Sequence, residues 1–309
     1  MHSTGENLML SELWDKAAKV TQAAYESKAL LSYQASVETV TEAGLTFYIR
    51  TLENLGEKQS PTFTKTDQNS LEASVKRNPF LEHDSELFVT NIGPNHKCLL
   101  NKYNVLDQHL LLVTQQFELQ ISVLHQQDFN ALHECLSAAP ALAFYNGGKT
   151  AGASQQHKHI QLIKAPDSIN QLVGLNPQLE MLNDEVPREL ETLPFKHAAL
   201  ALPAGLFDPN KSEDEAKDAA IQLKHLYDRL RMTLGLDCFT DSEHSEQLPA
   251  YNLLLTQKWM LVVPRSSESY AGISLNALAF SGSILVKNKD QAEEVKKAGI
   301  SKILQSVSL

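Results

Sequence analysis

The chain is short of cysteine, has no excess of positive charge and contains no long apolar run, and each shortage excludes a class of protein. Only three of its 309 residues are cysteines, scattered singly at positions 98, 135 and 238. This pattern excludes a disulfide framework and fits a reducing compartment. No apolar run approaches the ~20 residues of a membrane span, and residues 1–6 do not open a signal peptide. We therefore expect a cytoplasmic protein that spans no membrane.

The charge balance is acidic. Lysine and arginine together number 27, aspartate and glutamate 37, and the formal net charge is −10 at pH 7. Such a balance argues against a dedicated DNA- or RNA-binding protein. It leaves room for a local polyphosphate site, although we expect at least half of the candidate lysines to be solvated. The candidates are Lys102, Lys149, Lys158 and Lys164. Because the cysteines form no cluster, we also predict no structural zinc and no other resident metal.

Apolar periodicity predicts helices that alternate with short strands. Helices are expected at residues 11–30, 128–139, 212–234 and 290–298. Strands are expected at residues 37–40, 45–50, 87–89, 97–100, 109–114, 141–145, 156–163, 197–202, 251–256 and 259–263. Short strands in hairpin-like pairs favour an α+β fold with mainly antiparallel sheets. Residues 165–195 contain four prolines and divide the chain into halves, which we place at 1–170 and 171–309.

Residues 146–161 carry the most informative pattern, a glycine-rich turn followed by paired histidines. His157 and His159 stand two positions apart, and Gln161 follows two positions later. In a β-strand these three side chains share one face. The turn before them, which holds the hydroxyl of Ser154, can present backbone N–H groups to an anion. Imidazoles beside an anion cradle suit nucleophilic attack on a phosphate. A His-x-His pair is also a common metal-ligand arrangement.

The segment resembles the active-site motif of the histidine triad superfamily, in the His-x-His-x-Gln form of its transferase branch. With Lys158 between the histidines, where uridylyltransferases typically carry proline, it is similar to the Ap4A phosphorylases, also called ATP adenylyltransferases. Two further regions agree with that family in the same order along the chain. The first comprises residues 78–81, 99–105 and 109–114, and the second comprises residues 251–256, 259–265 and 272–276. The resemblance therefore covers nearly the whole chain.

The resemblance implies two related histidine-triad-like α+β halves, of which only the first carries the motif. A short sequence similarity between residues 110–114 and 260–264 also indicates two related halves. It also implies catalytic roles in the motif. His159 is expected to be the nucleophile, and His157 either supports the developing charge or packs behind the site. Gln161 can donate to a phosphoryl oxygen but cannot act as an acid or base. Ser154 can bond the bridging oxygen of the leaving group.

Further residues are expected, from the same resemblance, to bind the substrate. Asn101, eight residues before His109, takes the position that binds ribose hydroxyls. Asn146 takes a position near the α-phosphate, and Lys58 lies in the loop where the phosphorylases have a phosphate-binding lysine. Two residues of the second half are expected to close over the distal phosphates or the second nucleoside. The full expected set is Lys58, Asn101, Lys102, Asn146, Gly152, Ala153, Ser154, Gln155, Gln161, Ser274 and Asn276.

The implied activity is that of an ATP adenylyltransferase, which converts Ap4A and phosphate to ADP and ATP through an AMP–histidine intermediate. Transfer is expected instead of hydrolysis because Gln161 cannot activate water. The alternatives are another nucleotidyltransferase, such as one that uses a sugar phosphate, a dinucleotide hydrolase of the same superfamily, or a non-catalytic nucleotide- or metal-binding protein. Expected partners are the nucleotides Ap4A, ATP and ADP together with phosphate, with no nucleic acid and no membrane, in a monomer or homodimer. No firmly held cofactor is expected, and a divalent cation such as Mg²⁺ stays open.

Overall fold

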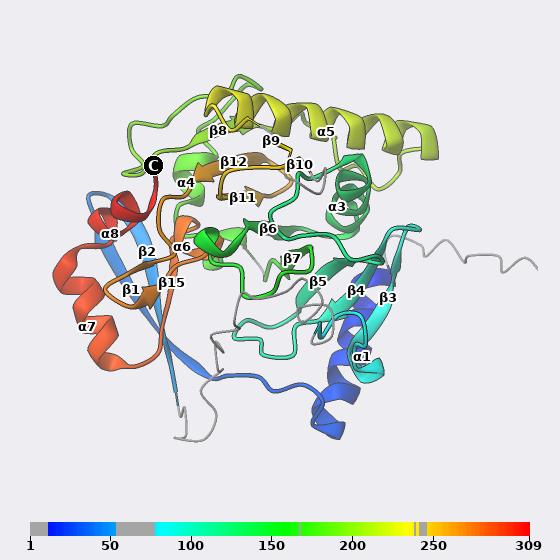
Figure 1. The fold of residues 1–309 in the computed structure, drawn as a ribbon, viewed down its shortest axis with the longest axis horizontal. Coiled ribbons are helices and arrows are strands. Elements are labelled where there is room, and N and C mark those ends of the chain that lie inside the picture. Colours follow the sequence, from blue (N-terminus) through cyan, green and yellow to red (C-terminus); the bar gives the residue numbers. More distant parts are fainter. Residues whose placement is uncertain (1–11, 54–77, 167, 238, 241–245) are drawn as a thin grey trace, which may run out of the picture.

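An eight-stranded sheet lies at the centre of the molecule (Figure 1). The computed structural model describes residues 12–53, 78–166, 168–237, 239–240 and 246–309. The strand order is β3-β4-β5-β7-β6-β11-β12-β8, and every neighbouring pair is antiparallel. The strands are β3 Phe88–Ile92, β4 His96–Leu100, β5 His109–Thr114, β6 Ala141–Gly147, β7 His159–Lys164, β8 Ala198–Ala201, β11 Tyr251–Leu255 and β12 Trp259–Pro264.

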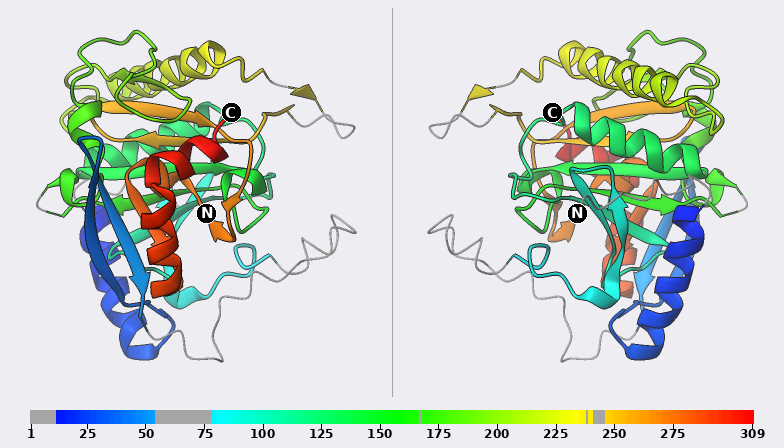
Figure 2. Two further views of the ribbon diagram at one scale, coloured as in Figure 1. Left: turned by 90° about the vertical axis from the view of Figure 1, so that its left-hand side faces the viewer. Right: turned by 90° about the vertical axis from the view of Figure 1, so that its right-hand side faces the viewer.

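Helices cover one face of this sheet, and a second sheet with further helices covers the other (Figures 1 and 2). The first face packs against α1 Glu12–Ser27, α3 Gln126–Ala138 and α5 Glu213–Thr233. The second face packs against β2 Leu45–Leu52, β15 Ser283–Val286, α4 Asn176–Leu179, α6 Ala277–Phe280, α7 Lys289–Ala298 and α8 Ile300–Val307. Strand β1 Ala35–Glu42 pairs with β2. Two small two-stranded sheets are formed by β9 Phe239–Thr240 with β10 Glu246–Gln247 and by β13 Ser269–Tyr270 with β14 Ile273–Ser274.

The alternation of side chains along the strands sorts the residues between these two layers. In β7, Ile160 and Leu162 point into the core under the helices, whereas Ile163 joins the core on the opposite face. His159 and Gln161 share the face of Ile163, because residues two apart point the same way. The strand register therefore puts the motif side chains on the face away from α1, α3 and α5.

The long helix shows how local sequence sets the element boundaries. Ser212 accepts a hydrogen bond from the backbone N–H of Glu215, and the Glu215 carboxylate accepts one from the Ser212 N–H in return. This capping box satisfies two N–H groups that the first turn leaves unpaired. Apolar residues at helical spacing then face the sheet and are buried. They are Ala219, Ala220, Leu223, Leu226, Tyr227 and Leu230.

The sequence similarity between residues 110–114 and 260–264 corresponds to equivalent strand pairs in the two halves, β5 with β7 and β12 with β8. Leu111 of β5 lies opposite Gln161 of β7, and its counterpart Leu261 of β12 lies opposite Ala199 of β8. The same alignment puts His197, two residues before Ala199, at the place of the second motif histidine. At the matched positions both halves have a histidine, but the second half has Ala199 where the first half has Gln161.

The predicted α+β class with mainly antiparallel sheets and two related halves is confirmed. The motif strand begins at His159 instead of residue 156, and His157 makes only an isolated bridge with Leu119. The division at residues 170 and 171 stays a prediction, and β6 pairs with β11 across it. Lys58 lies outside the described residues. No helix in the described part of the chain is both long and apolar enough to cross a bilayer.

Candidate active site

The ring of His159, at the start of β7, is held by the chain that leads into it. Its Nδ1 lies 2.8 Å from the carbonyl oxygen of His157, so Nδ1–H donates and Nε2 keeps a lone pair. Within the described residues Nε2 has no hydrogen-bond partner. Burial lowers the pKa of His159 to about 4, against the opposing effect of the bond to His157. The imidazole is therefore neutral at pH 7, which is the form that attacks an electrophile.

Gln120 fixes the backbone of His159. Its Oε1 accepts from the His159 N–H at 2.8 Å, and its Nε2 donates to the carbonyl oxygens of His159 at 3.1 Å and Asn146 at 3.0 Å. The register places Asn146 opposite His159, but pairing of β6 and β7 ends at Phe144 and Gln161. The buried Gln120 amide takes the place of the missing ladder bonds. Gln120 could not be identified from the sequence, because it lies far from the motif and belongs to no pattern.

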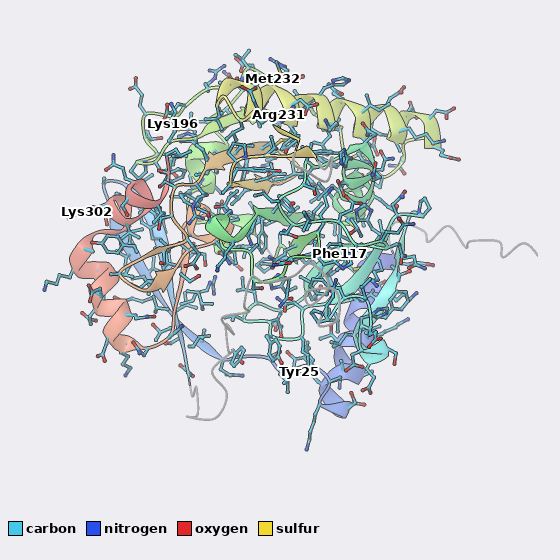
Figure 3. All side chains as sticks on the ribbon, viewed as in Figure 1. Tyr25, Phe117, Lys196, Arg231, Met232 and Lys302 are labelled. Carbon is cyan, nitrogen blue, oxygen red and sulfur yellow. The ribbon has the colours of Figure 1, made fainter. Side chains whose placement is uncertain are left out.

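Both ring nitrogens of His157 have protein partners. Asn78 Nδ2 donates to Nδ1 at 2.9 Å, and Nε2–H donates to the carbonyl oxygens of Thr114 at 2.9 Å and Gln116 at 3.1 Å. The ring of Phe117, labelled in Figure 3, lies 5.3 Å from the His157 ring. With no free nitrogen, His157 has the contacts of a residue that packs behind the site, which is the second of its two expected roles.

Gln161 is joined to Asn101 through His109. His109 Nε2 lies 2.9 Å from Gln161 Oε1, and His109 Nδ1 lies 3.2 Å from Asn101 Nδ2. Burial lowers the pKa of His109 to about 4, opposed by the bond to Gln161, so this ring is also neutral at pH 7. Two predicted site residues, Asn101 and Gln161, are thus connected by His109, which was not among the predicted site residues.

Apolar side chains line the same face of the sheet next to His159. Phe80 lies with its ring centroid 5.2 Å from that of His159 and packs against Leu99, Leu111 and Val113. Leu99 belongs to β4, Leu111 and Val113 belong to β5, and Asn101 directly follows β4. An apolar wall that ends in a polar amide suits a nucleoside, whose base is flat and whose ribose is hydroxylated.

The second half reaches the site through Asn146. Its Oδ1 accepts from Asn252 Nδ2 and from the backbone N–H of Ala277, each at 2.9 Å. Asn252 also donates to the carbonyl oxygen of Ala151, at 2.9 Å, and accepts from Arg265 Nη1 at 2.6 Å. All of these side chains are buried. The glycine-rich turn is therefore anchored to β11 and β12 by a polar network of the second half.

Gly152 and Asn276 are in direct contact. Gly152 has a φ of +90°, and an added Cβ would lie 2.8 Å from both the Asn276 Cβ and the Leu275 carbonyl oxygen. Only glycine fits this backbone conformation and this approach. Asn276 caps α6 by accepting from the Leu278 N–H at 3.0 Å. Three predicted substrate-binding residues, Asn146, Gly152 and Asn276, are thus brought together around the turn.

Other predicted residues lie at the edge of this arrangement. Ser154 is exposed, and no hydrogen bond of its hydroxyl is found among the described residues. Ala153, Gln155 and Lys102 are half-buried. Ser274 is exposed, and its hydroxyl is bonded to Glu268. The structure does not bring the Ser274 hydroxyl to the turn in the way that it brings Asn276.

Lys158 contradicts the expectation that the motif lysine is either solvated or part of a polyphosphate cluster. It is completely buried, with Nζ 2.7 Å from Asp128 and 2.9 Å from Glu118. Side chains alternate between the two faces of a strand, so the residue next to the site-facing His159 points into the opposite core. Burial alone would raise the pKa of Asp128, but the hydrogen bond from His96 and the Lys158 ammonium lower it overall.

Within the described part of the chain, no group of three or more His, Cys, Asp and Glu side chains is arranged to hold a metal ion. A metal shared by His157 and His159 needs a free nitrogen on each ring. His157 would have such a nitrogen only if it lost its hydrogen bond to Asn78 or those to Thr114 and Gln116. The geometry therefore disfavours the alternative of a metal-binding histidine pair.

Comparison with known proteins agrees along the chain. The model of the Ap4A phosphorylase N-terminal domain matches residues 4–180, and that of the ATP adenylyltransferase C-terminal domain matches residues 191–309. Diadenosine 5',5'''-P1,P4-tetraphosphate phosphorylase 2 of Saccharomyces cerevisiae is 31% identical over 255 residues, which cover 75% of each chain.

Solved structures agree as well. The crystal structure of yeast Ap4A phosphorylase Apa2 has a TM-score of 0.72 at 26% identity, over 97% of this chain and 95% of that one. The same yeast protein in complex with Ap4A has a TM-score of 0.68 at 23% identity, over 97% and 98% of the two chains, and supports the fold. These matches define a nucleotidyltransferase. The chain belongs to the Ap4A phosphorylase family, which confirms the resemblance seen in its sequence.

Proposed function

We propose that the protein is an ATP adenylyltransferase that splits Ap4A with inorganic phosphate into ATP and ADP. The observation that carries this proposal is the orientation of His159. Its Nδ1–H is committed to the His157 carbonyl oxygen at 2.8 Å, so the lone pair of Nε2 is available. The curated yeast relative is an Ap4A phosphorylase, which supports the choice of substrate.

In the first step, the Nε2 lone pair of His159 attacks an α-phosphorus of Ap4A. An N–P bond forms, the bond from that phosphorus to the bridging oxygen breaks, and ATP leaves with the electron pair. The ring becomes cationic as it attacks, which strengthens its hydrogen bond to the His157 carbonyl oxygen. The backbone clamp of Gln120 keeps the ring in place during this change.

In the second step, an oxygen of inorganic phosphate attacks the phosphorus of the AMP–histidine. The N–P bond breaks, ADP leaves, and His159 recovers its lone pair. Gln161 is an amide and cannot remove a proton from water. The intermediate therefore waits for phosphate, which arrives with an ionised oxygen and needs no base.

The amides around the turn supply hydrogen-bond donors for the phosphates. Asn146 lies opposite His159, and no acceptor for its Nδ2 is found within the described residues. We assign this group, the Gln161 amide and Asn276 to the polyphosphate. A divalent cation such as Mg²⁺ would enter with the polyphosphate.

We also propose that the protein is located in the cytoplasm, which the buried free thiols of Cys98 and Cys135 support. Its oligomeric state, monomer or homodimer, stays a prediction.

Phosphate labelled with ³²P tests the reaction directly. The protein is incubated with Ap4A and labelled phosphate, and the nucleotides are separated. The proposal predicts equal amounts of ADP and ATP, with all the label in the β-phosphate of ADP. Unlabelled AMP as the partner of ATP would instead show a hydrolase, and no turnover of Ap4A would leave only a binding protein.

A further inference from the structure

A hydrogen-bonded chain of four groups begins just after β4, at Tyr103 and Asn101, and ends at Gln161 of β7. The backbone N–H of Tyr103 donates to Asn101 Oδ1 at 3.2 Å. Asn101 Nδ2 then faces His109 Nδ1 at 3.2 Å, and His109 Nε2 faces Gln161 Oε1 at 2.9 Å. His109 is 9% exposed and its ring lies against Phe144, so water does not compete freely for these bonds.

The direction of every bond in the chain follows from its first member. A backbone N–H can only donate, so Asn101 must present its oxygen to Tyr103 and its NH₂ group to His109. His109 Nδ1 therefore accepts, which places the ring proton on Nε2. Nε2–H in turn requires the oxygen of the Gln161 amide. The Nε2 group of Gln161 is then left with both of its N–H bonds, and no acceptor for them is found within the described residues.

We propose that Asn101 and His109 are positioning residues that set which end of the Gln161 amide faces the reacting phosphoryl group. The oxygen and the NH₂ group of the Gln161 amide are nearly equal in size, so shape alone does not select which of them faces the phosphoryl group. Turned one way, the amide donates to a phosphoryl oxygen. Turned the other way, it sets a carbonyl oxygen against that anion. The chain excludes the second orientation before the substrate arrives, which is preorganisation of an electrostatic contact.

This proposal rests on the proposed function, because it assumes a phosphoryl group beside Gln161. It also gives Asn101 a role that does not depend on ribose. The carboxamide of Asn101 uses its oxygen and one N–H inside the protein, which leaves one N–H for a ligand. His109, in contrast, has no nitrogen left for the substrate, so changing it acts through its bonded neighbours Asn101 and Gln161.

The first test replaces His109 with phenylalanine, which keeps a ring but removes both nitrogens. The rate of adenylylation of His159 is measured in a single turnover with Ap4A, together with the affinity for Ap4A. The expected loss is about tenfold to a hundredfold in rate, the effect of one misdirected hydrogen bond in a buried site. Affinity changes less than rate. His133→Phe is the matched control, since His133 is a buried histidine that bonds the Leu206 carbonyl oxygen at 2.9 Å away from the site.

The second test is a double-mutant cycle. If His109 acts only by orienting Gln161, then His109→Phe has no further effect once Gln161→Ala has removed the amide. His109→Gln should restore most of the rate, because its carboxamide can accept from Asn101 and donate to Gln161 at once. A full additional loss from His109→Phe in the Gln161→Ala protein, or no recovery in His109→Gln, would overturn the proposal.

The tautomer of His109 can be measured independently of enzymatic activity. In the unmodified protein, the ¹⁵N chemical shifts of His109 should show a proton on Nε2 and none on Nδ1. A proton on Nδ1 would overturn the proposal, whatever the variants do. Because this measurement uses the unmodified protein, it also decides the question if His109→Phe fails to fold. A protein that has the expected tautomer but does not transfer AMP would refute the proposed function alone.

Discussion

His159 and His197 hold their rings by the same hydrogen bond in the two halves of the molecule. His159 Nδ1 lies 2.8 Å from the carbonyl oxygen two residues before it, and His197 Nδ1 lies 2.7 Å from the carbonyl oxygen of Phe195. The other nitrogen differs. His197 Nε2 accepts from the backbone N–H of Leu190 at 2.9 Å. The lone pair of His197 Nε2 is engaged in this hydrogen bond, whereas that of His159 Nε2 has no partner among the described residues. The two rings are therefore held in the same way, but only His159 has a nitrogen available to a ligand.

This relationship predicts opposite outcomes for two identical substitutions. His159→Asn should remove nearly all turnover, since loss of a covalent nucleophile typically costs several orders of magnitude, and the fold should stay intact. His197→Asn should lower the free energy of unfolding by on the order of 1–3 kcal/mol and leave the adenylylation rate unchanged. Single-turnover kinetics and urea denaturation separate the two effects. Substantial activity in His159→Asn, or a comparable rate loss in His197→Asn, would contradict the assignment.

The pKa of His159 predicts how the rate depends on pH. Burial lowers it to about 4, so the nucleophile stays unprotonated as pH falls through the ordinary histidine range. The rate of adenylylation should therefore show no loss near pH 6.5 and should fall only as pH approaches 4. A half-maximal rate near pH 6.5 would show that the ring is more accessible to water than the structure indicates.

Stability must be followed in the same pH series. His109 and His159 both have lowered pKa values in the folded state because they are buried. Between pH 6.5 and about 4 the unfolded chain binds more protons than the folded one, so the free energy of unfolding decreases as pH falls through this window. Circular dichroism at each pH distinguishes loss of the nucleophile from loss of the fold.

Lys158 and Lys196 provide a matched pair for stability, since each directly precedes the corresponding histidine. Lys158 is buried between Asp128 and Glu118, whereas Lys196 lies at the surface, where it pairs with the exposed Glu189 (Figure 3). Lys158→Met should destabilise by about 3–5 kcal/mol, because it leaves the buried Asp128 carboxylate without its ammonium partner. Lys196→Met should stay within about 0.5 kcal/mol. Equal urea midpoints for the two variants would refute the buried ion pair.

Gln161→His should alter the products as well as the rate. A histidine at this position can remove a proton from water, which an amide cannot do. The ratio of AMP to ADP, measured by chromatography at a fixed phosphate concentration, should therefore rise. If Gln161 only orders the strand, the variant loses activity while that ratio stays the same.

The local features of the site could be predicted from the sequence, because the motif is continuous. His159 and Gln161 follow a period of two, and a strand turns that period into a shared face. The same rule, applied to Lys158, predicts that it points into the opposite core. The positive charge of Lys158, however, led to the prediction of a solvated or phosphate-binding side chain. Its buried partner Asp128 could not be identified from the spacing of residues.

The contacts that orient the site could not be predicted, because they cross between strands. Gln120 reaches His159 from a loop before α3, and His109 reaches Gln161 across β5 and β7. These contacts depend on the register, which no local pattern fixes. Asn252 and Arg265 lay within a region that resembled the family, but only the fold shows that they hold the glycine-rich turn.

The most direct test of the central claim is the intact mass of the protein after incubation with Ap4A in phosphate-free buffer. We expect a stable increase by one AMP group that is absent in His159→Asn. The AMP group should be discharged as ADP when phosphate is added. Rapid release of free AMP with no adduct and no dependence on phosphate would contradict transfer through His159.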